Sequence, residues 1–195
     1  MLTSKRFRYC GILLFLAIFL YSTIVVSYDN KKDEHGAPYD PFYWSSGNLD
    51  VFVAFPGQPE TLNFDSQFTE GKATQYSQNC DEGVTVYQVS QTKTPGLEEV
   101  RETYILEFFM EFIYKNMNGI VVDEIERNWT KTQRNLNILN YKYSYVFEGI
   151  HVFKEGKMLY VNNSVFDINT RTNTPEMEKI KESIKFFLSS ITIQN

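Results

Sequence analysis

The alternation of apolar and polar residues is clearest between residues 136 and 166. Tyr141, Tyr143, Tyr145 and Phe147 occupy every second position of this stretch. Successive side chains of a strand point to opposite faces, so this spacing places the four rings on one face. The pattern predicts an extended strand with one aromatic side that another element must cover.

Two glycine-containing dipeptides divide this stretch. Glu148-Gly149 predicts a break in the strand, and Glu155-Gly156 predicts a tight hairpin turn with the glycine in the left-handed conformation. Lys157 to Val165 is then the expected return strand. The whole stretch predicts a meander of antiparallel strands.

The same alternation indicates strands elsewhere in the chain. Pro56 to Pro59 ends the first of them, because proline donates no hydrogen bond to a strand ladder. The expected strands are Leu49–Phe55, Glu60–Phe68, Lys72–Cys80, Val84–Gln91 and Ile120–Trp129.

Helical spacing appears in two segments. The first is expected to run from about Leu97 to Met117, with Pro95 just before it. Its apolar stripe is expected to face the sheet and comprises Leu97, Val100, Tyr104, Ile105, Phe108, Phe112 and Ile113.

The second helix is expected to begin at Thr174-Pro175, with threonine as the N-cap. Its expected buried face comprises Met177, Ile180, Ile184, Phe187 and Leu188, and residues 189–193 form a short extended tail. The order of elements predicts an α+β fold, in which a central antiparallel sheet is covered by helices.

The N-terminal segment differs from the rest of the chain. Basic residues at positions 5, 6 and 8 precede an apolar run of 18 residues, from Cys10 to Ser27. This arrangement is typical of a signal anchor or a signal peptide, and the sequence leaves both open for residues 1–27. Basic residues tend to stay in the cytoplasm. We therefore expect a single-pass membrane protein whose C-terminal domain lies outside the cytoplasm, in the periplasm, or a secreted domain if cleavage follows Ser27.

Residues 28–47 combine charges with Gly36, Pro38 and Pro41 and lack periodicity, which predicts a polar tether. Phe42 to Trp44 at its end are expected to dock on the domain. Residues 48–195 are then a single α+β domain.

Charge and cysteine content exclude some classes. The chain carries 19 basic and 24 acidic residues, and removing Lys5, Arg6 and Arg8 leaves 16 basic residues, a net charge of −8. Such an acidic domain argues against nucleic-acid binding. Cys10 lies in the apolar N-terminal segment and Cys80 lies in the domain, so we predict no disulfide between them.

Four short stretches carry a family resemblance. Phe52 to Pro59 resembles the strand and "FPxxP" opening of small exported bacterial domains of the PsbP-like type. The run from Tyr141 to Gly149, Gly156 to Val161 ("GKxLYV") and Phe186 to Ile191 (similar to "FLxSF", with Ile191 replacing phenylalanine) resemble later motifs. The resemblance spans Leu49 to Ile193. It implies an α/β/α sandwich and a binding or assembly role, and it transfers no site residue.

Catalytic chemistry is weakly represented. The sequence contains no CxxC, HExxH, GxSxG, phosphate-binding loop or dinucleotide fingerprint. Cys80 with His151 is a conceivable thiol pair, but no third residue orients it. Asp123, Glu124 and Glu126 are more typical of a solvated strand edge than of a cation or acid–base site.

Two further motifs match the glycosylation sequon, at Asn128 and Asn162, and their use depends on the host. We predict no catalytic, cofactor or metal site. The leading hypothesis is a non-enzymatic, extracytoplasmic binding or assembly domain. Its partner is expected to be an envelope protein or a small ligand, and its membrane contact the N-terminal segment. The alternative is an envelope hydrolase with an unrecognised carboxylate site around Asp123 to Glu126.

Overall fold

The computed structural model describes residues 41–47, 50–65, 70–80, 83–116, 120–132 and 135–194. Residues 1–27, predicted to be a signal anchor or signal peptide, and most of the predicted tether lie outside these residues. Within the described ranges, no helix is long and apolar enough to cross a bilayer.

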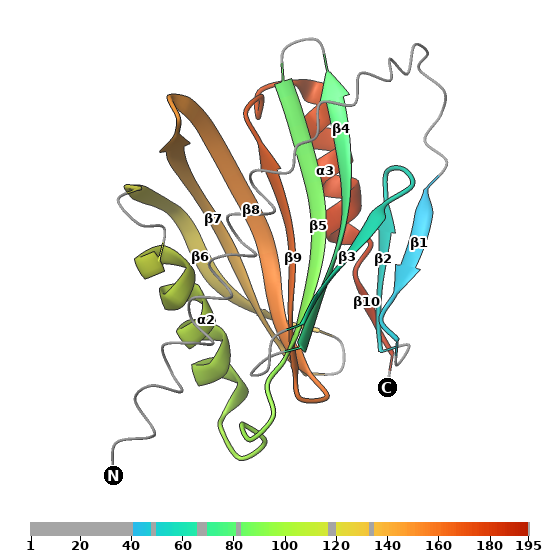
Figure 1. The fold of residues 1–195 in the computed structure, drawn as a ribbon, viewed down its shortest axis with the longest axis vertical. Coiled ribbons are helices and arrows are strands. Elements are labelled where there is room, and N and C mark those ends of the chain that lie inside the picture. Colours follow the sequence, from blue (N-terminus) through green and yellow to red (C-terminus); the bar gives the residue numbers. More distant parts are fainter. Residues whose placement is uncertain are drawn as a thin grey trace.

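A seven-stranded antiparallel sheet forms the centre of the structure, with the order β3-β4-β5-β9-β8-β7-β6 (Figure 1). Strands β3 to β5 follow the sequence order, whereas β6 to β9 lie in reverse order beside them, so β9 pairs with β5 at the middle of the sheet and β6 forms the far edge. Its strands are β3 (Glu60–Asp65), β4 (Glu70–Cys80), β5 (Gly83–Lys93), β6 (Val122–Lys131), β7 (Asn137–Phe147), β8 (Ile150–Val161) and β9 (Ser164–Thr172).

A second sheet has three strands, β1 (Phe42–Ser45), β2 (Val51–Phe55) and β10 (Thr192–Ile193), with β2 in the middle. Phe42 lies opposite Phe55 and Trp44 opposite Val53. The expected docking of residues 42–44 thus takes the form of a strand. The folded part therefore begins before residue 47, where the tether was expected to end.

Helices α2 (Glu102–Asn116) and α3 (Glu178–Ser189) pack on opposite faces of the large sheet. Neighbouring residues of β8 show the division: Met158 belongs to the core under α2, and Leu159 belongs to the core under α3. The second core also includes Val51, Val53 and Phe55 of β2. The aromatic face predicted at Tyr141, Tyr143 and Tyr145 is confirmed, because all three rings are buried against α2.

The predicted fold class, a central sheet covered by helices, is wrong. Strands make up 56% of the structure and helices 19%, so the fold is β-rich. Helix α2 contacts β7 and β8, and α3 contacts β5 and β9, so each covers only part of its face. The small sheet shares the cover on the α3 side. Helix content was overestimated because the apolar pattern at residues 97–101 forms turns ahead of α2.

The hairpin turn predicted at Glu155-Gly156 is also wrong, since both residues lie inside β8. The chain reverses instead at Asn162 and Asn163, whose φ angles are 46° and 57°. Two consecutive left-handed residues form the type of turn that suits a two-residue hairpin, and asparagine tolerates this conformation well. The break predicted at Glu148-Gly149 is confirmed as the turn between β7 and β8.

The buried face of α2 differs from the predicted stripe. Ile105 and Ile113 are buried as expected, but Tyr104 and Phe108 are 63% and 60% exposed. Leu106 and Met110 are buried instead. Apolar residues surround this helix, so periodicity alone does not determine which side faces the sheet.

Helix α3 begins three residues later than predicted, with Met177 rather than Thr174 at its N-cap and without a side-chain cap. Residues 174–177 form a turn, in which the Met177 N–H donates to the Thr174 carbonyl. The predicted apolar face is confirmed: Ile180, Ile184 and Phe187 are buried in the core. Met177 and Leu188 pack against its edge.

Candidate functional site

A groove of about 530 Å³ lies between α3 and the part of the large sheet that α3 leaves uncovered. Its volume falls in the range of small-molecule sites. Its charged lining residues are Lys142, Lys154, Glu155, Lys157, Glu176, Lys181 and Lys185. Its other lining residues are Ile125, Phe153, Thr170, Thr172, Pro175, Ile184, Leu188 and Ser189.

Strand alternation builds the floor of the groove. Tyr141 and Tyr143 point toward α2, so Lys142 between them points to the opposite side. Lys142 lies opposite Glu155 on β8, and Glu155 lies opposite Thr170 on β9. This row therefore crosses three strands on the face that carries the groove.

One face of α3 forms the wall. Lys181, Ile184, Lys185 and Leu188 are spaced by three, one and three residues, which places them on the same side of a helix. Ile184 is buried against the sheet, and Lys181 and Lys185 are exposed at the rim. The wall is therefore apolar at its base and basic at its edge.

Two of the groove lysines form ion pairs, and both pairs are exposed and weak. Lys142 lies 3.3 Å from Glu155, and Lys181 lies 3.3 Å from Glu176. Exposed pairs of this kind contribute about 0–1 kcal/mol, so they leave the lysines available. Lys157 donates to the Leu188 carbonyl at 2.9 Å, and burial lowers the pKa of its ammonium group.

Beneath the floor, a buried polar cluster joins three strands on the α2 side. The Lys154 ammonium lies 3.4 Å from the Asp167 carboxylate, with a side chain that is 0% exposed. Tyr141 Oη donates to Asp167 Oδ1 at 2.5 Å, and Asn169 donates to Oδ2 at 3.0 Å. A buried carboxylate requires such donors.

Burial lowers the pKa of Lys154 to about 8, although the Asp167 charge opposes this shift. Burial also raises the pKa of Tyr141 and Tyr143, and the charge of Asp167 adds to the effect. Perturbed pKa values mark either active sites or internal ion pairs. The absence of solvent access to Lys154 favours the second interpretation, in which the cluster holds β7, β8 and β9 together beneath the groove.

The predicted carboxylates of β6 separate onto two faces. Glu124 lies opposite Tyr143, whereas Asp123 lies opposite Ser144 and Glu126 lies opposite Lys142. Tyr143 faces α2, so Glu124 points to that side and the other two point away from it. A β-bulge between Glu124 and Glu126 adds to the displacement. The three residues therefore do not converge as one acidic site.

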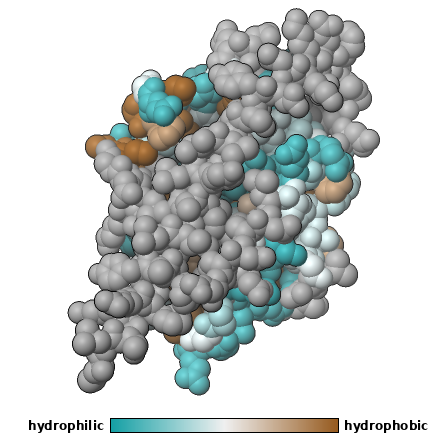
Figure 2. Space-filling model, viewed as in Figure 1, coloured by the Kyte–Doolittle hydropathy of each residue, from teal (hydrophilic) through white to brown (hydrophobic). Residues whose placement is uncertain are grey.

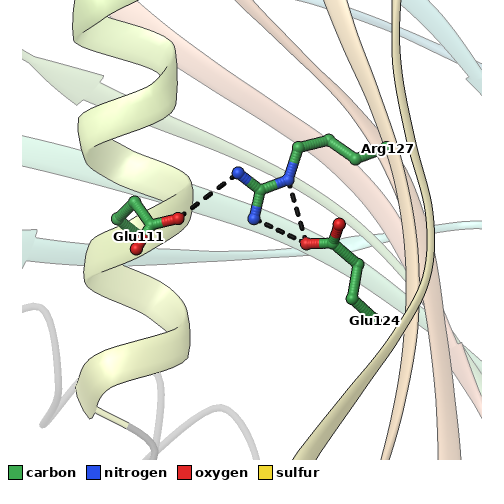
Figure 3. A network of polar contacts seen from close by, with 3 residues as sticks. All are labelled: Glu111, Glu124 and Arg127. Atoms are coloured by element: carbon green, nitrogen blue, oxygen red, sulfur yellow. Dashed lines mark hydrogen bonds and ion pairs between the residues drawn. The ribbon is translucent and has the colours of Figure 1, made fainter.

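Glu124 instead takes part in a bridge between sheet and helix (Figure 3). Arg127 Nη2 lies 2.6 Å from Glu124, and Nη1 lies 3.3 Å from Glu111 on α2. The guanidinium also lies 5.1 Å from the centre of the Tyr114 ring. These contacts tie the edge strand β6 to α2 and indicate a structural role for Glu124.

The conceivable pair of Cys80 and His151 is not supported by the topology. Cys80 is in β4 and His151 is in β8, and both β5 and β9 lie between them. Three strand spacings correspond to about 14 Å, too far for a proton transfer between them. Among the described residues, no three His, Cys, Asp or Glu side chains are grouped to hold a metal ion.

Both sequon asparagines are exposed. Asn128 lies in β6, where it donates to Glu126 and accepts from Asn140. Asn162 lies in the turn before β9 and donates to Asp50 at 2.8 Å.

Sequence reasoning missed the groove, because its lining comes from strands and a helix far apart in the chain. The signal that was available is the spacing of Lys181 and Lys185 beside the apolar face of the last helix.

Exposed apolar residues gather at one end of the sheet. Figure 2 shows hydrophobic surface at the upper left, over the ends of β7 and β8. Val146 and Ile150 flank the turn there and are 55% and 52% exposed, and Val121 just before β6 is 78% exposed. We call these three residues the apolar tip.

The sequence matches no protein-family model and no curated protein. The structure is similar to cyanobacterial PsbP (CyanoP) from Synechocystis, with a TM-score of 0.55, 10% identity and coverage of 84% of this chain and 97% of that chain. It is also aligned with LpqN from Mycobacterium tuberculosis, a protein involved in cell envelope biogenesis (TM-score 0.41, 13% identity, covering 80% and 91%). A third match is PA94 from Pseudomonas aeruginosa, of unknown function (0.38, 9%, 76% and 95%).

At these identities the likeness concerns the fold alone, and only the CyanoP match is close enough to carry an argument. It agrees with the resemblance seen in the motifs between Leu49 and Ile193. The chain has a PsbP-like fold.

Proposed function

We propose that this chain is a non-enzymatic binding domain that acts outside the cytoplasm, with the groove beside α3 as its ligand site. The observation that carries the proposal is the groove itself, which combines an apolar wall with a rim of ammonium groups. A concave site with a few polar groups on an apolar lining is the usual form of a small-molecule site.

Two features support the location. The basic start and apolar run of residues 1–27 are typical of an export signal or anchor, and the PsbP-like fold is consistent with the exported domains that the motifs resemble. The domain is then either held at the membrane or released after Ser27.

Hydrolysis by the β6 carboxylates is the less favoured alternative, since Glu124 lies on the opposite face from Asp123 and Glu126. If these carboxylates are catalytic, replacing all three with amides destroys turnover, and the thermal midpoint falls only by the small amount expected from losing the exposed Glu124–Arg127 ion pair.

The test is recovery of bound molecules with the full-length protein, tagged after Asn195 and isolated from gently solubilised host membranes. Lys142→Trp fills the groove from its floor, while Lys72→Trp places the same ring on β4, at an exposed position that does not line the groove. Quantitative mass spectrometry is expected to find a small molecule with the wild type and with Lys72→Trp, and several-fold less of it with Lys142→Trp.

Equal recovery from all three proteins would exclude the groove as the site. Turnover of a common ester, peptide, phosphate or glycan substrate that a single substitution abolishes would exclude a non-enzymatic role. Intact mass of the bait also reports the N-terminus, and a chain starting at Tyr28 would demonstrate cleavage.

Assembly with an envelope protein is the second candidate, and the apolar tip favours it. Exposed apolar side chains that cluster mark contact surfaces more often than scattered ones do. A stoichiometric protein that is recovered with the wild type and lost with a Val146→Ser/Ile150→Ser variant would support this role.

A further inference from the structure

The groove carries the opposite charge balance to the chain around it. The whole chain has 24 acidic and 19 basic residues. The charged residues whose side chains belong to the groove are four lysines (142, 157, 181 and 185) and two glutamates (155 and 176). Lys154 lines it as well, but its ammonium group points to Asp167 beneath the floor. A basic cleft in an acidic domain concentrates anions.

The four ammonium groups do not have equal partners. Lys142 and Lys181 each face one carboxylate at 3.3 Å, and Lys157 has a backbone carbonyl. No ion pair is formed by Lys185 with the described part of the chain, although it stands one turn from Lys181 on the same face of α3. Lys181 and Lys185 therefore offer a pair of ammonium groups at one rim, where Glu176 is the one carboxylate of the described residues within ion-pair distance of either lysine.

The apolar lining lies directly beside this rim. Ile184 and Leu188 alternate with the two lysines along α3, and Phe153 lies on the floor. A ligand that is anionic throughout would leave these surfaces in contact with water, and a wholly apolar ligand would leave the ammonium groups unused. The lining fits a ligand that has one charged end and one apolar part.

We propose that the groove binds an anionic amphiphile, a molecule with a carboxylate or phosphate head and a single short apolar chain. The head lies at Lys181 and Lys185, and the apolar part lies against Ile184, Leu188 and Phe153. This inference rests on the proposed function of the groove, and it adds the chemical class of the ligand.

The test compares 4-phenylbutyrate with 4-phenylbutyramide, which has nearly the same shape without the charge. The full-length protein is placed in nanodiscs of zwitterionic phosphatidylcholine, and binding is measured by ligand-observed NMR, with empty nanodiscs as the blank. The carboxylate is expected to bind at least tenfold more tightly than the amide. Lengthening the linker by one CH₂ is expected to tighten binding several-fold, because more apolar surface is buried.

The matched variants remove two charges each. Lys181→Gln/Lys185→Gln acts at the rim, and Lys72→Gln/Lys179→Gln acts at exposed positions that do not line the groove. The preference for the carboxylate is expected to vanish in the first variant and to persist in the second. The thermal midpoints are compared to confirm that both fold.

Equal binding of the two probes, blocked by Lys142→Trp, would leave the groove as a site and overturn the anionic class. A preference that survives in the rim variant would place the anion elsewhere and overturn the proposal. Failure of both probes to bind at millimolar concentration would overturn it too, while the recovery experiment with Lys142→Trp separately decides whether the groove is used.

Discussion

Gly156 of β8 lies close to side chains and backbone of the neighbouring strands β7 and β9. A Cβ atom built there would be 2.6 Å from Tyr141 Oη and 2.7 Å from both Asn169 Cβ and the Ile168 carbonyl. No φ value in the left-handed range is involved, so the constraint is space rather than backbone conformation. The glycine allows Tyr141 to reach Asp167 across the surface of β8.

Gly156→Ala is therefore expected to lower the free energy of unfolding by about 1–3 kcal/mol, the usual cost of overpacking. Urea unfolding of the full-length protein, followed by fluorescence, measures the change. Gly47→Ala is the control, because a Cβ there has nothing within 4 Å. A Gly156→Ala variant as stable as the control would show that the packing around Tyr141 yields easily.

At the residue scale, the sequence predicted which tyrosines share a buried face, but not which polar side chains contact them there. The alternation of Tyr141, Tyr143 and Tyr145 was enough to predict one buried face. It did not reveal that Lys154 lies on the same face of the sheet against Asp167, because the pairing depends on the register between β8 and β9. The sequence predicts a turn at Gly156, because a glycine needed for close packing and a glycine needed for a turn look alike in sequence.

The buried face of α2 could not be predicted from the sequence. The helix has two apolar faces, and its rotation about its own axis decides which of them packs on the sheet. The buried face contains Leu106 and Met110, and the exposed face contains Tyr104 and Phe108. Aromatic contacts between Phe108 and Phe112 continue the exposed face along the helix.

Leu106→Ala is expected to cost about 2–5 kcal/mol of unfolding free energy, as for other large buried side chains. Phe108→Ser is expected to change it by less than about 0.5 kcal/mol beyond the small helix-propensity term, because the ring is mostly exposed. Thermal unfolding of both variants compares the two faces directly. The reverse order of effects would mean that the helix packs with the stripe predicted from periodicity.

Of the two turns that border β8, the sequence predicted one correctly and misplaced the other. Glu148-Gly149 was correctly predicted from its glycine, which has φ 81°. Asn162-Asn163 was overlooked in favour of Glu155-Gly156, although two consecutive asparagines also suit a tight hairpin. The displaced turn assigned the second half of β8 to the return strand, and residues 166–172 of β9 lay outside the predicted strands.

At the scale of the whole molecule, buried tyrosines make stability depend on high pH. Burial raises the pKa of Tyr141, Tyr143 and Tyr145, and burial with the Glu124 charge raises the pKa of Tyr114 to about 12. In the unfolded chain each tyrosine ionises near pH 10. Between about pH 10 and 12 the unfolded state therefore releases protons that the folded state retains, and the free energy of unfolding falls as pH rises.

Urea midpoints at pH 10.5 and 11.5 measure this fall. Lys154 contributes the opposite slope from about pH 8 up to its ordinary pKa of 10.5, so lower pH values are avoided. Tyr114→Phe removes one of the groups and is expected to reduce the slope. A midpoint that does not change across this range, or a slope that is unaffected in Tyr114→Phe, would contradict the account.

The overall architecture was predictable in part. The motifs between Leu49 and Ile193 led to a PsbP-like fold, which the similarity to CyanoP confirms. The predicted cover of the sheet by helices alone is wrong, because a small sheet shares that cover. The sequence does not show this sheet, since it pairs β2 with β1 and with β10 from the other end of the chain. The groove had no signature of its own, because it exists only where α3 leaves parts of β7, β8 and β9 uncovered.

The most direct test of the groove is photolabelling of the full-length protein with a benzophenone derivative of 4-phenylbutyrate, with unlabelled 4-phenylbutyrate as competitor. Labelled peptides are expected from residues 142–157 and 170–189, with labelling that the competitor removes and that Lys142→Trp prevents. Labelling confined to α2 or to β3 and β4, or labelling that the competitor does not reduce, would contradict the assignment of the groove as the binding site.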